Sequence, residues 1–196
     1  MLRKCLTISV TATLLFVVAY AGTTREYKID NNHSTVGFSV PILGGLSHVT
    51  GKFTDFDIAL HVDEADITKS AVKVTIKSAS ISTGIAARDE HLKTADFFDA
   101  AKFPEINFES TQIKKQGKAF AAVGNLTMHG VTKPIEIPFN IAGTVKKDSS
   151  RNVGYTGRLT LNRRDFGVNW EHPTSPNFVG DNVEIQIELI TKLIKD

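Results

Sequence analysis

Apolar and polar residues alternate with a period of two through most of this chain. Phe56, Ile58, Leu60 and Val62, for example, share one parity, and Asp57 and His61 take the other. Such alternation is typical of β-strands with one buried face. The same pattern predicts strands within residues 25–30, 34–40, 47–62, 72–76, 106–108, 120–128, 135–145, 153–161 and 183–189.

These segments amount to about eight strands, mostly antiparallel because the connections between them are short. We find no helical pattern long enough for a parallel crossover, so the chain is mainly all-β. Eight strands with one apolar face either stack as two sheets or close into a barrel. A barrel of this size is just wide enough to hold a ligand when small residues line it.

Three details refine the predicted strands. In residues 41–46 two glycines interrupt the pattern but three apolar residues remain, so this turn is expected to fold over an opening. Ala122 and Gly124 lie in the apolar row of residues 120–128, where small side chains leave space. Pro138 indicates an edge or bulge position in its strand.

Residues 78–110 depart from the alternation. A strand ends near Ser82, a short charged helix is predicted over residues 88–93, and a new strand begins at Pro104. We interpret the segment as a lid on the barrel mouth, with Leu92, Phe97 and Phe98 inward and Asp89, Glu90 and Lys93 in solvent. Residues 162–181 form a second irregular stretch, which contains Trp170, the only tryptophan.

The first residues resemble an export signal. Arg3 and Lys4 precede an apolar run, and Ala19-Tyr20-Ala21 fits a cleavage site between small residues. We therefore predict a signal peptide over residues 1–21 and one mature domain over residues 22–196, located in the periplasm or secreted. The alternative is an uncleaved anchor helix, although the apolar run is shorter than the roughly 20 residues that a span needs.

Charge and cysteine content narrow the partners. The chain has 23 basic and 21 acidic residues, and loss of residues 1–21 removes Arg3 and Lys4, which leaves a balanced mature chain. A balanced chain argues against nucleic acid and against a polybasic lipid-binding patch. Cys5 is the only cysteine and leaves with the signal, so the mature chain forms neither a disulfide nor a thiolate metal site.

Sequence motifs for common catalytic and cofactor sites are absent. We find no nucleophile elbow, H-E-x-x-H, P-loop or dinucleotide-binding motif, and no two histidines are four residues apart. We therefore expect no cofactor, no resident metal and no catalytic residues. A metal site assembled from distant strands is an alternative to structural histidines.

The densest polar cluster is Arg88, Asp89 and His91. In one interpretation it begins the helix, with Asp89 and Glu90 near the positive end of the helix dipole and Arg88 paired to a carboxylate. In the other, Arg88 or His91 donates to the polar head of a ligand. In a second cluster, Arg164 and Asp165 are predicted to form an ion pair that fixes a strand end.

Aromatic residues gather in the irregular segments, where the lining of a barrel mouth would lie. They either line a ligand cavity or plug the barrel ends as ordinary core. The aromatic residues in question are Phe97, Phe98, Phe103, Phe166, Trp170 and Phe178.

Several motifs resemble, in order and spacing, those of the YceI-like family. The most specific part is Arg88-Asp89-Glu90-His91-Leu92 followed by Phe97-Phe98-Asp99 and Pro104-Glu105-Ile106-Asn107-Phe108. The match also includes Asp30 to Ser34, Gly124 to Thr132 and Arg164 to Gly167, and it covers nearly all of the mature chain. The resemblance implies an exported lipocalin-like antiparallel barrel that carries a long isoprenoid or another amphipathic lipid, and it carries over no catalytic residue.

The resulting expectation is a binding protein rather than an enzyme. Its partner is a long-chain isoprenoid or similar lipid, with contact to a membrane or lipid donor, and a homodimer is left open. The rivals are an enzyme that acts on isoprenoid or acyl lipids through His91 and Asp89, and a packed barrel that binds proteins. The expected ligand-binding residues are Phe38, Arg88, His91, Leu92, Phe97, Phe98, Phe108, Phe120, Leu126, Phe166 and Trp170.

Overall fold

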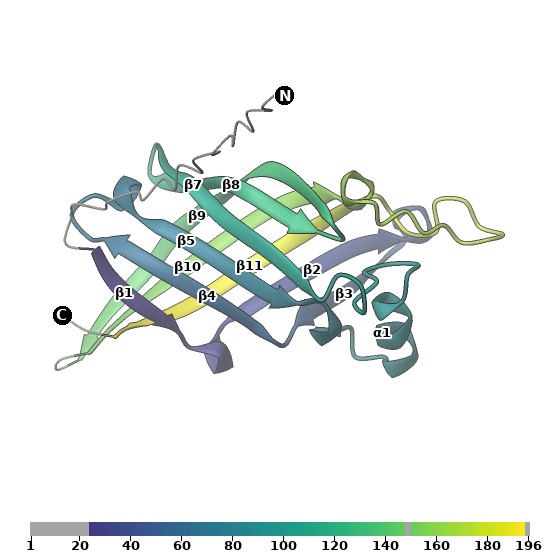
Figure 1. The fold of residues 1–196 in the computed structure, drawn as a ribbon, viewed down its shortest axis with the longest axis horizontal. Helices are drawn as coiled ribbons and strands as arrows, with labels where there is room; N and C mark the ends of the chain where they lie inside the picture. The colour runs from purple at the N-terminus through teal and green to yellow at the C-terminus, as the bar shows by residue number, and fades with distance from the viewer. Residues whose placement is uncertain (1–23, 148–149, 195–196) are drawn as a thin grey trace, which may run out of the picture.

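The computed structural model describes residues 24–147 and 150–194. The predicted signal peptide, residues 1–21, lies outside these ranges. Within them the chain forms eleven strands and one α-helix (Figure 1). The strands are β1 (Thr24–Ile29), β2 (Thr35–Ile42), β3 (Ser47–Phe53), β4 (Phe56–Asp63), β5 (Ala71–Lys77), β6 (Ile81–Ser82), β7 (Glu105–Gln116), β8 (Ala119–Met128), β9 (Val131–Lys147), β10 (Ser150–Asn162) and β11 (Asn182–Leu193).

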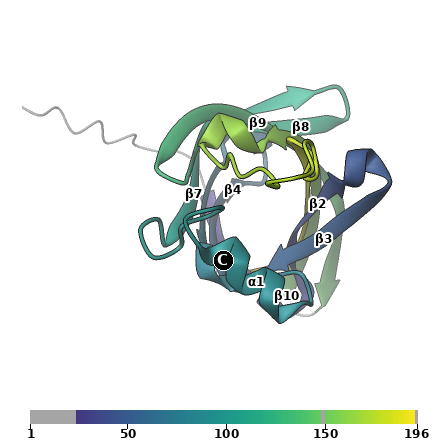
Figure 2. The same cartoon turned by 90° about the vertical axis from the view of Figure 1, so that its right-hand side faces the viewer.

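Eight of these strands close into an antiparallel barrel. They follow the order β1-β4-β5-β7-β8-β9-β10-β11, and pairing of β1 with β11 closes the ring. Figure 2 looks into this ring from the end that carries the helix α1 (Ala86–Lys93). The predicted eight-stranded barrel with one short helix is therefore confirmed.

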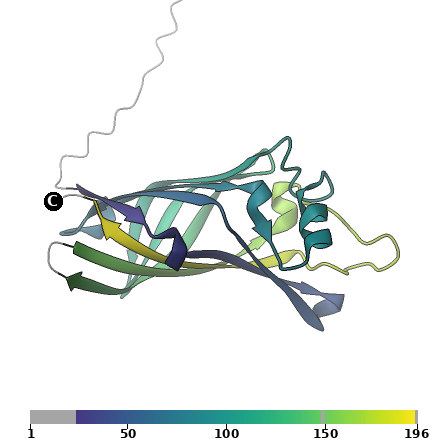
Figure 3. The same ribbon diagram turned by 90° about the horizontal axis from the view of Figure 1, so that it is seen from below.

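The three additional strands extend one wall of the barrel. β1 pairs with the end of β11 at Thr191, and β2 pairs with the same strand further back, from Glu184 to Glu188. The short 3-10 turn η1 (Asn31–His33) separates β1 from β2, in the gap between the predicted strands 25–30 and 34–40. β2, β3 and β6 consequently continue the wall past the closed ring, towards α1 (Figure 3).

The apolar rows of the strands face the interior, as the alternation predicts. Phe56, Ile58 and Val62 on β4 are buried, and Ile76 on β5 and Ile106 on β7 join them. Pro138 on β9 pairs with β8 but lies just beyond the end of the β9–β10 pairing, which fits the predicted edge position. The barrel interior is therefore an apolar surface contributed by every strand of the ring.

The prediction that small residues on β8 leave space is wrong for Gly124. A Cβ atom at this position would lie 2.2 Å from the carbonyl oxygen of Glu109 on β7. The neighbouring strand has its register shift at this point, between Ser110 and Gln112. Glycine is required there for close approach of two backbones, whereas Ala122 does line the interior.

Residues 41–46 also differ from the prediction. β2 runs on to Ile42, and the 3-10 turn η2 (Leu43–Gly45) forms the tip of the β2–β3 hairpin. Ile42 lines the interior, but Leu43 is 49% exposed and Leu46 is 88% exposed. The tip therefore projects from the mouth instead of folding over it.

Candidate functional site

Two adjoining cavities occupy the barrel. The inner cavity, of about 170 Å³, lies within the closed ring, and the mouth cavity, of about 360 Å³, lies beside α1. Each is far larger than the roughly 10–15 Å³ that holds one water molecule. Four residues line both cavities, and we call this junction the waist: Val36, Ile76, Leu126 and Leu161.

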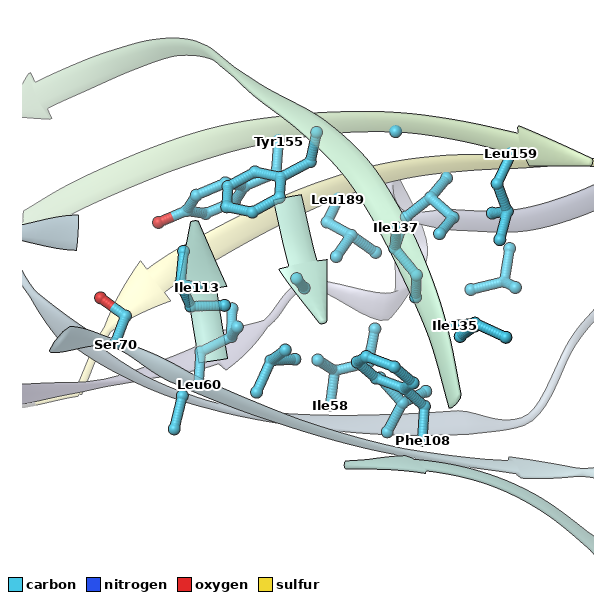
Figure 4. Close-up of a pocket in the computed structure, with 18 of the residues that line it drawn as sticks. Ile58, Leu60, Ser70, Phe108, Ile113, Ile135, Ile137, Tyr155, Leu159 and Leu189 are labelled. Atoms are coloured by element: carbon cyan, nitrogen blue, oxygen red, sulfur yellow. The ribbon is translucent and has the colours of Figure 1, made fainter. Parts of the chain in front are cut away.

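The inner cavity is lined mainly by aliphatic side chains. Figure 4 shows side chains such as Ile58, Ile137 and Leu189 directed into it from several strands. None of the residues that line it is charged. Tyr155 and Ser70 bring oxygen atoms to it, and burial raises the pKa of Tyr155 to about 12. This cavity can hold a hydrocarbon chain but offers nothing to neutralise a charged group.

A polar cluster lies at the far end of the inner cavity. The Glu64 carboxylate accepts hydrogen bonds from Tyr27 and Arg151, and Arg25 lies 3.4 Å away. Burial, followed by the bond to Glu64, raises the pKa of Tyr27 above its usual range. Tyr27 packs with Val62 and Val153 against Tyr155, so this end of the cavity is backed by a small second core.

The mouth cavity is lined by aromatic residues from the irregular segments. The rings of Phe97 and Trp170 lie 5.1 Å apart between centroids, and His91 lies edge-on to both. Phe98 packs edge-on against Phe53 at 5.9 Å. Aromatic pairs of this geometry add about 0.5–1.5 kcal/mol beyond the area they bury. The lid and the loop after η5 (Arg163–Phe166) thus hold each other across the mouth.

Arg88, Asp89 and His91 each have a partner at the mouth. Arg88 Nε donates to the Thr83 hydroxyl at 2.7 Å, so the predicted pairing of Arg88 with a carboxylate is wrong. Asp89 accepts the Thr83 backbone N–H at 2.7 Å, and the hydrogen bond from the Thr83 hydroxyl lowers the pKa of Asp89. His91 Nε2 lies 2.7 Å from the Asp96 carboxylate. Arg88 and His91 nevertheless line the cavity.

Arg163 is a mouth residue that sequence reasoning missed. It is 6% exposed, and burial lowers the pKa of its guanidinium. It donates to the carbonyl oxygens of Val168 at 2.7 Å and Gly180 at 3.0 Å, and to the Asp181 carboxylate at 3.1 Å. Arg163 therefore fastens both ends of the loop 167–181, which carries Trp170, to the barrel.

The predicted ion pair of Arg164 with Asp165 is not formed. Arg164 donates to Asp181 at 2.6 Å and to Glu171 at 2.7 Å, whereas Asp165 lies 3.0 Å from Lys133. The turn η5 places neighbouring side chains in different directions, so adjacency in sequence did not identify the partners. The charged groups still tie the loop to the strand end.

Most of the expected ligand-binding residues meet in the two cavities. The mouth cavity brings together Phe38, Arg88, His91, Leu92, Phe97, Phe98, Leu126 and Trp170. Phe108 lines the inner cavity. Phe120 and Phe166 line neither cavity: Phe120 stacks on Phe139 at 5.6 Å, and Phe166 is core at 2% exposed.

The aliphatic lining from β2, β4, β5 and β11 was not singled out from the sequence. In the sequence these residues show only the alternation that marks an inward-facing strand position, and every core residue of a strand shows the same pattern. Phe103, another aromatic considered above, packs on His129 at 4.7 Å away from both cavities, and Phe178 lines the mouth cavity.

Among residues 24–147 and 150–194, no group of three or more His, Cys, Asp or Glu side chains could hold a metal ion. No helix in the same ranges is long and apolar enough to cross a membrane. The carboxylates of Asp89 and Asp165 contact different partners, Thr83 and Lys133.

Known proteins share both the sequence and the fold. A UPF0312 protein from Pseudomonas savastanoi pv. phaseolicola is 37% identical over 196 residues, covering 98% of this chain and 100% of the relative. The crystal structure of the Campylobacter jejuni YCEI protein superposes with a TM-score of 0.68 at 30% identity, covering 77% of this chain and 88% of that one.

A more distant structure shares the fold alone. It is a polyisoprenoid binding domain from Saccharophagus degradans, with a TM-score of 0.64 at 15% identity, covering 85% of this chain and 98% of that one. The family model of the YceI-like domain matches residues 27–191. The family model and the 37% identical relative together show that the chain belongs to the YceI-like domain family.

Proposed function

We propose that this protein is an exported carrier that holds a long-chain isoprenoid or a similar amphipathic lipid inside its barrel. The observation that carries the proposal is the pair of adjoining apolar cavities that meet at the waist. An interior packed for stability alone would fill this space, because protein cores pack as densely as organic crystals. The ligand-binding residues are those of the two linings, including Leu92, Phe97, Phe98 and Trp170.

Burial of hydrocarbon would supply most of the affinity. At about 25 cal/mol per Å², a chain that buries several hundred Å² gains on the order of 10 kcal/mol before the costs of association. One hydrogen bond to the head contributes only about 1 kcal/mol. Chain length should therefore matter more to affinity than the identity of the head.

The distribution of charge favours one orientation of the ligand. The charged side chains of the lining, Arg88 and Arg163, belong to the mouth cavity, together with His91. Arg163 already donates to three carbonyl groups and a carboxylate, so Arg88 and His91 are the better candidates for contact with a polar head. The tail would then pass the waist into the uncharged inner cavity.

A structural neighbour and the first residues of the sequence support the proposed function. The polyisoprenoid binding domain of Saccharophagus degradans has the same fold at 15% identity, so a barrel of this fold is compatible with the proposed class of ligand. The predicted signal peptide over residues 1–21 supports export, and we place the protein in the periplasm or outside the cell.

The two rival functions find less support. The first rival, a protein-binding barrel, requires a packed interior, whereas this interior holds two cavities. An enzyme acting through His91 and Asp89 would need both groups at the ligand, but Asp89 lines neither cavity and its carboxylate accepts hydrogen bonds from Thr83. If that enzyme exists, Asp89→Asn should abolish turnover of a bound lipid and leave its binding intact.

Extraction of the purified protein with organic solvent tests the proposed function. We expect mass spectrometry of the extract to show a lipid with a long hydrocarbon chain in near-stoichiometric amount. A protein purified from the same cells by the same steps, but without a cavity, provides the background of adventitious lipid. Lipid-free protein from a membrane-exposed preparation would contradict the proposal.

A further inference from the structure

The tip of the β2–β3 hairpin carries apolar side chains into solvent. Leu46 is 88% exposed and Leu43 is 49% exposed. No Asp, Glu, Lys or Arg occurs in residues 40–51, which form this tip and its flanks. Figure 3 shows the hairpin, in blue, reaching past α1 at the mouth end of the barrel.

Folding alone does not account for a leucine at position 43. Its φ is 55°, in the left-handed region, and Gly44 and Gly45 follow with φ of 66° and 94°. A bulky side chain at such a φ is strained, and glycine or asparagine would serve the turn better. Strain of this kind is retained mainly where it serves a function, which here points to the exposed apolar side chain itself.

The tip is joined to a second uncharged segment at the mouth. The Leu43 N–H donates to the Phe178 carbonyl oxygen at 2.9 Å, and the Gly180 N–H donates to that of Pro41 at 2.8 Å. Residues 172–180 also contain no Asp, Glu, Lys or Arg. We call these two segments, residues 40–51 and 172–180, the rim.

The rim is continuous with the mouth cavity. Val40, Ile42 and Val49 from the hairpin line that cavity, and so do Phe178 and Val179 from the loop. A lipid that leaves the cavity past the rim would therefore meet apolar residues as far as Leu43 and Leu46. The rim joins the binding site to the outer surface of the protein.

The opposite end of the barrel has a different surface. Lys146 near the end of β9 and Arg151 near the start of β10 place charged residues beside the turn between these strands. Val145 at that end is 66% exposed, but charged residues follow it directly. Of these two hairpins, therefore, the one at the mouth exposes two leucines without a charged residue beside them, and the other does not.

We propose that the rim docks on a phospholipid bilayer by inserting Leu43 and Leu46 at its surface, so that lipid passes between bilayer and mouth cavity without crossing water. The inference rests on the proposed function and names the donor or acceptor of its ligand. Because the rim contains no Asp, Glu, Lys or Arg, insertion is driven by apolar burial and needs no anionic lipid. High salt should therefore leave docking unchanged.

Transfer of a fluorescent prenol from phosphatidylcholine vesicles to the purified protein tests the inference. We expect the double variant Leu43→Asp/Leu46→Asp to slow transfer by about tenfold or more, because two carboxylates oppose insertion. Val145→Asp is the matched control, an exposed apolar residue at the other hairpin, and should transfer at the wild-type rate. The wild-type rate should persist in high salt.

Binding of the same prenol from detergent micelles separates this inference from the proposed function. We expect the double variant to bind the micellar probe as tightly as wild type, which also shows that it is folded.

If wild type fails to bind from micelles, the proposed function is wrong. If all proteins bind but the double variant transfers at the wild-type rate, or transfer requires anionic lipid and falls with salt, the docking inference is wrong. Size-exclusion chromatography shows whether the rim instead binds a second copy of this chain. In that case wild type elutes as a dimer, the double variant elutes as a monomer, and both transfer the prenol at the same rate.

Discussion

The inner cavity and the mouth cavity lie in one barrel but are built by different parts of the chain. Strands of the closed ring form most of the inner cavity, whose lining is mainly aliphatic and carries no charge. The mouth cavity depends also on α1, on the loop 167–181 and on the β2–β3 hairpin, and it includes aromatic rings, two arginines and a histidine. The closed ring fixes the first, whereas the second also depends on ring contacts of the lid and on backbone bonds between the loop and the hairpin.

Under the proposed function, the two cavities would contribute different parts of lipid binding. The inner half would give affinity in proportion to the hydrocarbon that it buries, and it would distinguish ligands by length and bulk. The mouth half would contact the polar head through Arg88 or His91. Changes in the two halves should therefore alter different properties of the protein.

The largest effect on the mouth half is expected from Arg163→Met. The substitution leaves the carbonyl groups of Val168, Val179 and Gly180 and the Asp181 carboxylate without their buried donor. We expect a loss of about 3–5 kcal/mol in the free energy of unfolding, measured by urea denaturation.

Arg158→Met is the control for Arg163→Met. Arg158 is exposed on β10 and lies 3.1 Å from Glu184 at the surface, so its loss should cost less than about 1 kcal/mol. Equal effects of the two substitutions would show that the loop 167–181 is not held by Arg163.

Leu126→Trp is designed to separate the two halves at the waist. Leu126 is 7% exposed and lines both cavities, so a larger side chain there should stop a lipid tail from reaching the inner cavity. We expect affinity for a long prenol to fall roughly 100-fold, equivalent to a few buried methylene groups.

Leu126→Met conserves side-chain volume at the waist and should retain the affinity within a few fold. Isothermal titration calorimetry with the prenol in detergent measures both variants. Wild-type affinity in Leu126→Trp would show that the ligand does not pass the waist.

Ala122→Leu tests the inner half by itself. Ala122 is 5% exposed and lines only the inner cavity, so leucine there would shorten the available space without contact to the lid. We expect about tenfold weaker binding of long prenols and unchanged binding of short ones. A uniform loss for all lengths would indicate a general disturbance of the barrel rather than a shorter cavity.

The smallest effect is expected from acid on the lid. The Thr83 hydroxyl lowers the pKa of Asp89, which means that the ionised carboxylate is favoured in the folded state. Its contribution is therefore complete above the ordinary Asp pKa of about 3.9 and is lost as pH falls through the lowered value. We expect the fluorescence of Trp170 to report loosening of the lid only at the acid end of a titration.

Asp89→Asn should remove most of that acid step. Asp66→Asn is the matched control in the inner half, because the Thr68 hydroxyl lowers the pKa of Asp66 in the same way at η3 (Ile67–Lys69). That control should leave the Trp170 signal as in wild type. An unchanged acid step in Asp89→Asn would place the lid's pH dependence elsewhere.

The direction in which each strand residue faces was predictable from the sequence, although the role of the aliphatic residues in lining a cavity was not. Alternation along β4 and β8 identified inward residues such as Ile58 and Leu126, because a strand fixes which side each residue faces. The role of Arg163 could not be predicted in this way, since its partners Val168 and Gly180 are backbone groups whose positions depend on how the loop returns. Gly124 was misjudged for a similar reason: the close approach of Glu109 follows from a bulge in the neighbouring strand.

The rim shows the same limit. The sequence indicated apolar residues in the turn after Pro41, but whether they face the cavity or solvent depends on where β2 ends. One further residue of strand places Ile42 in the cavity lining and leaves Leu43 exposed.

Native mass spectrometry with prenols of increasing length tests whether one lipid occupies both cavities. We expect a single lipid per chain, with affinity that rises with each isoprene unit until both cavities are filled, and with no further gain beyond that length. Affinity that does not depend on chain length, or a protein that remains bare at every length, would contradict the claim that the barrel holds a lipid through both of its cavities.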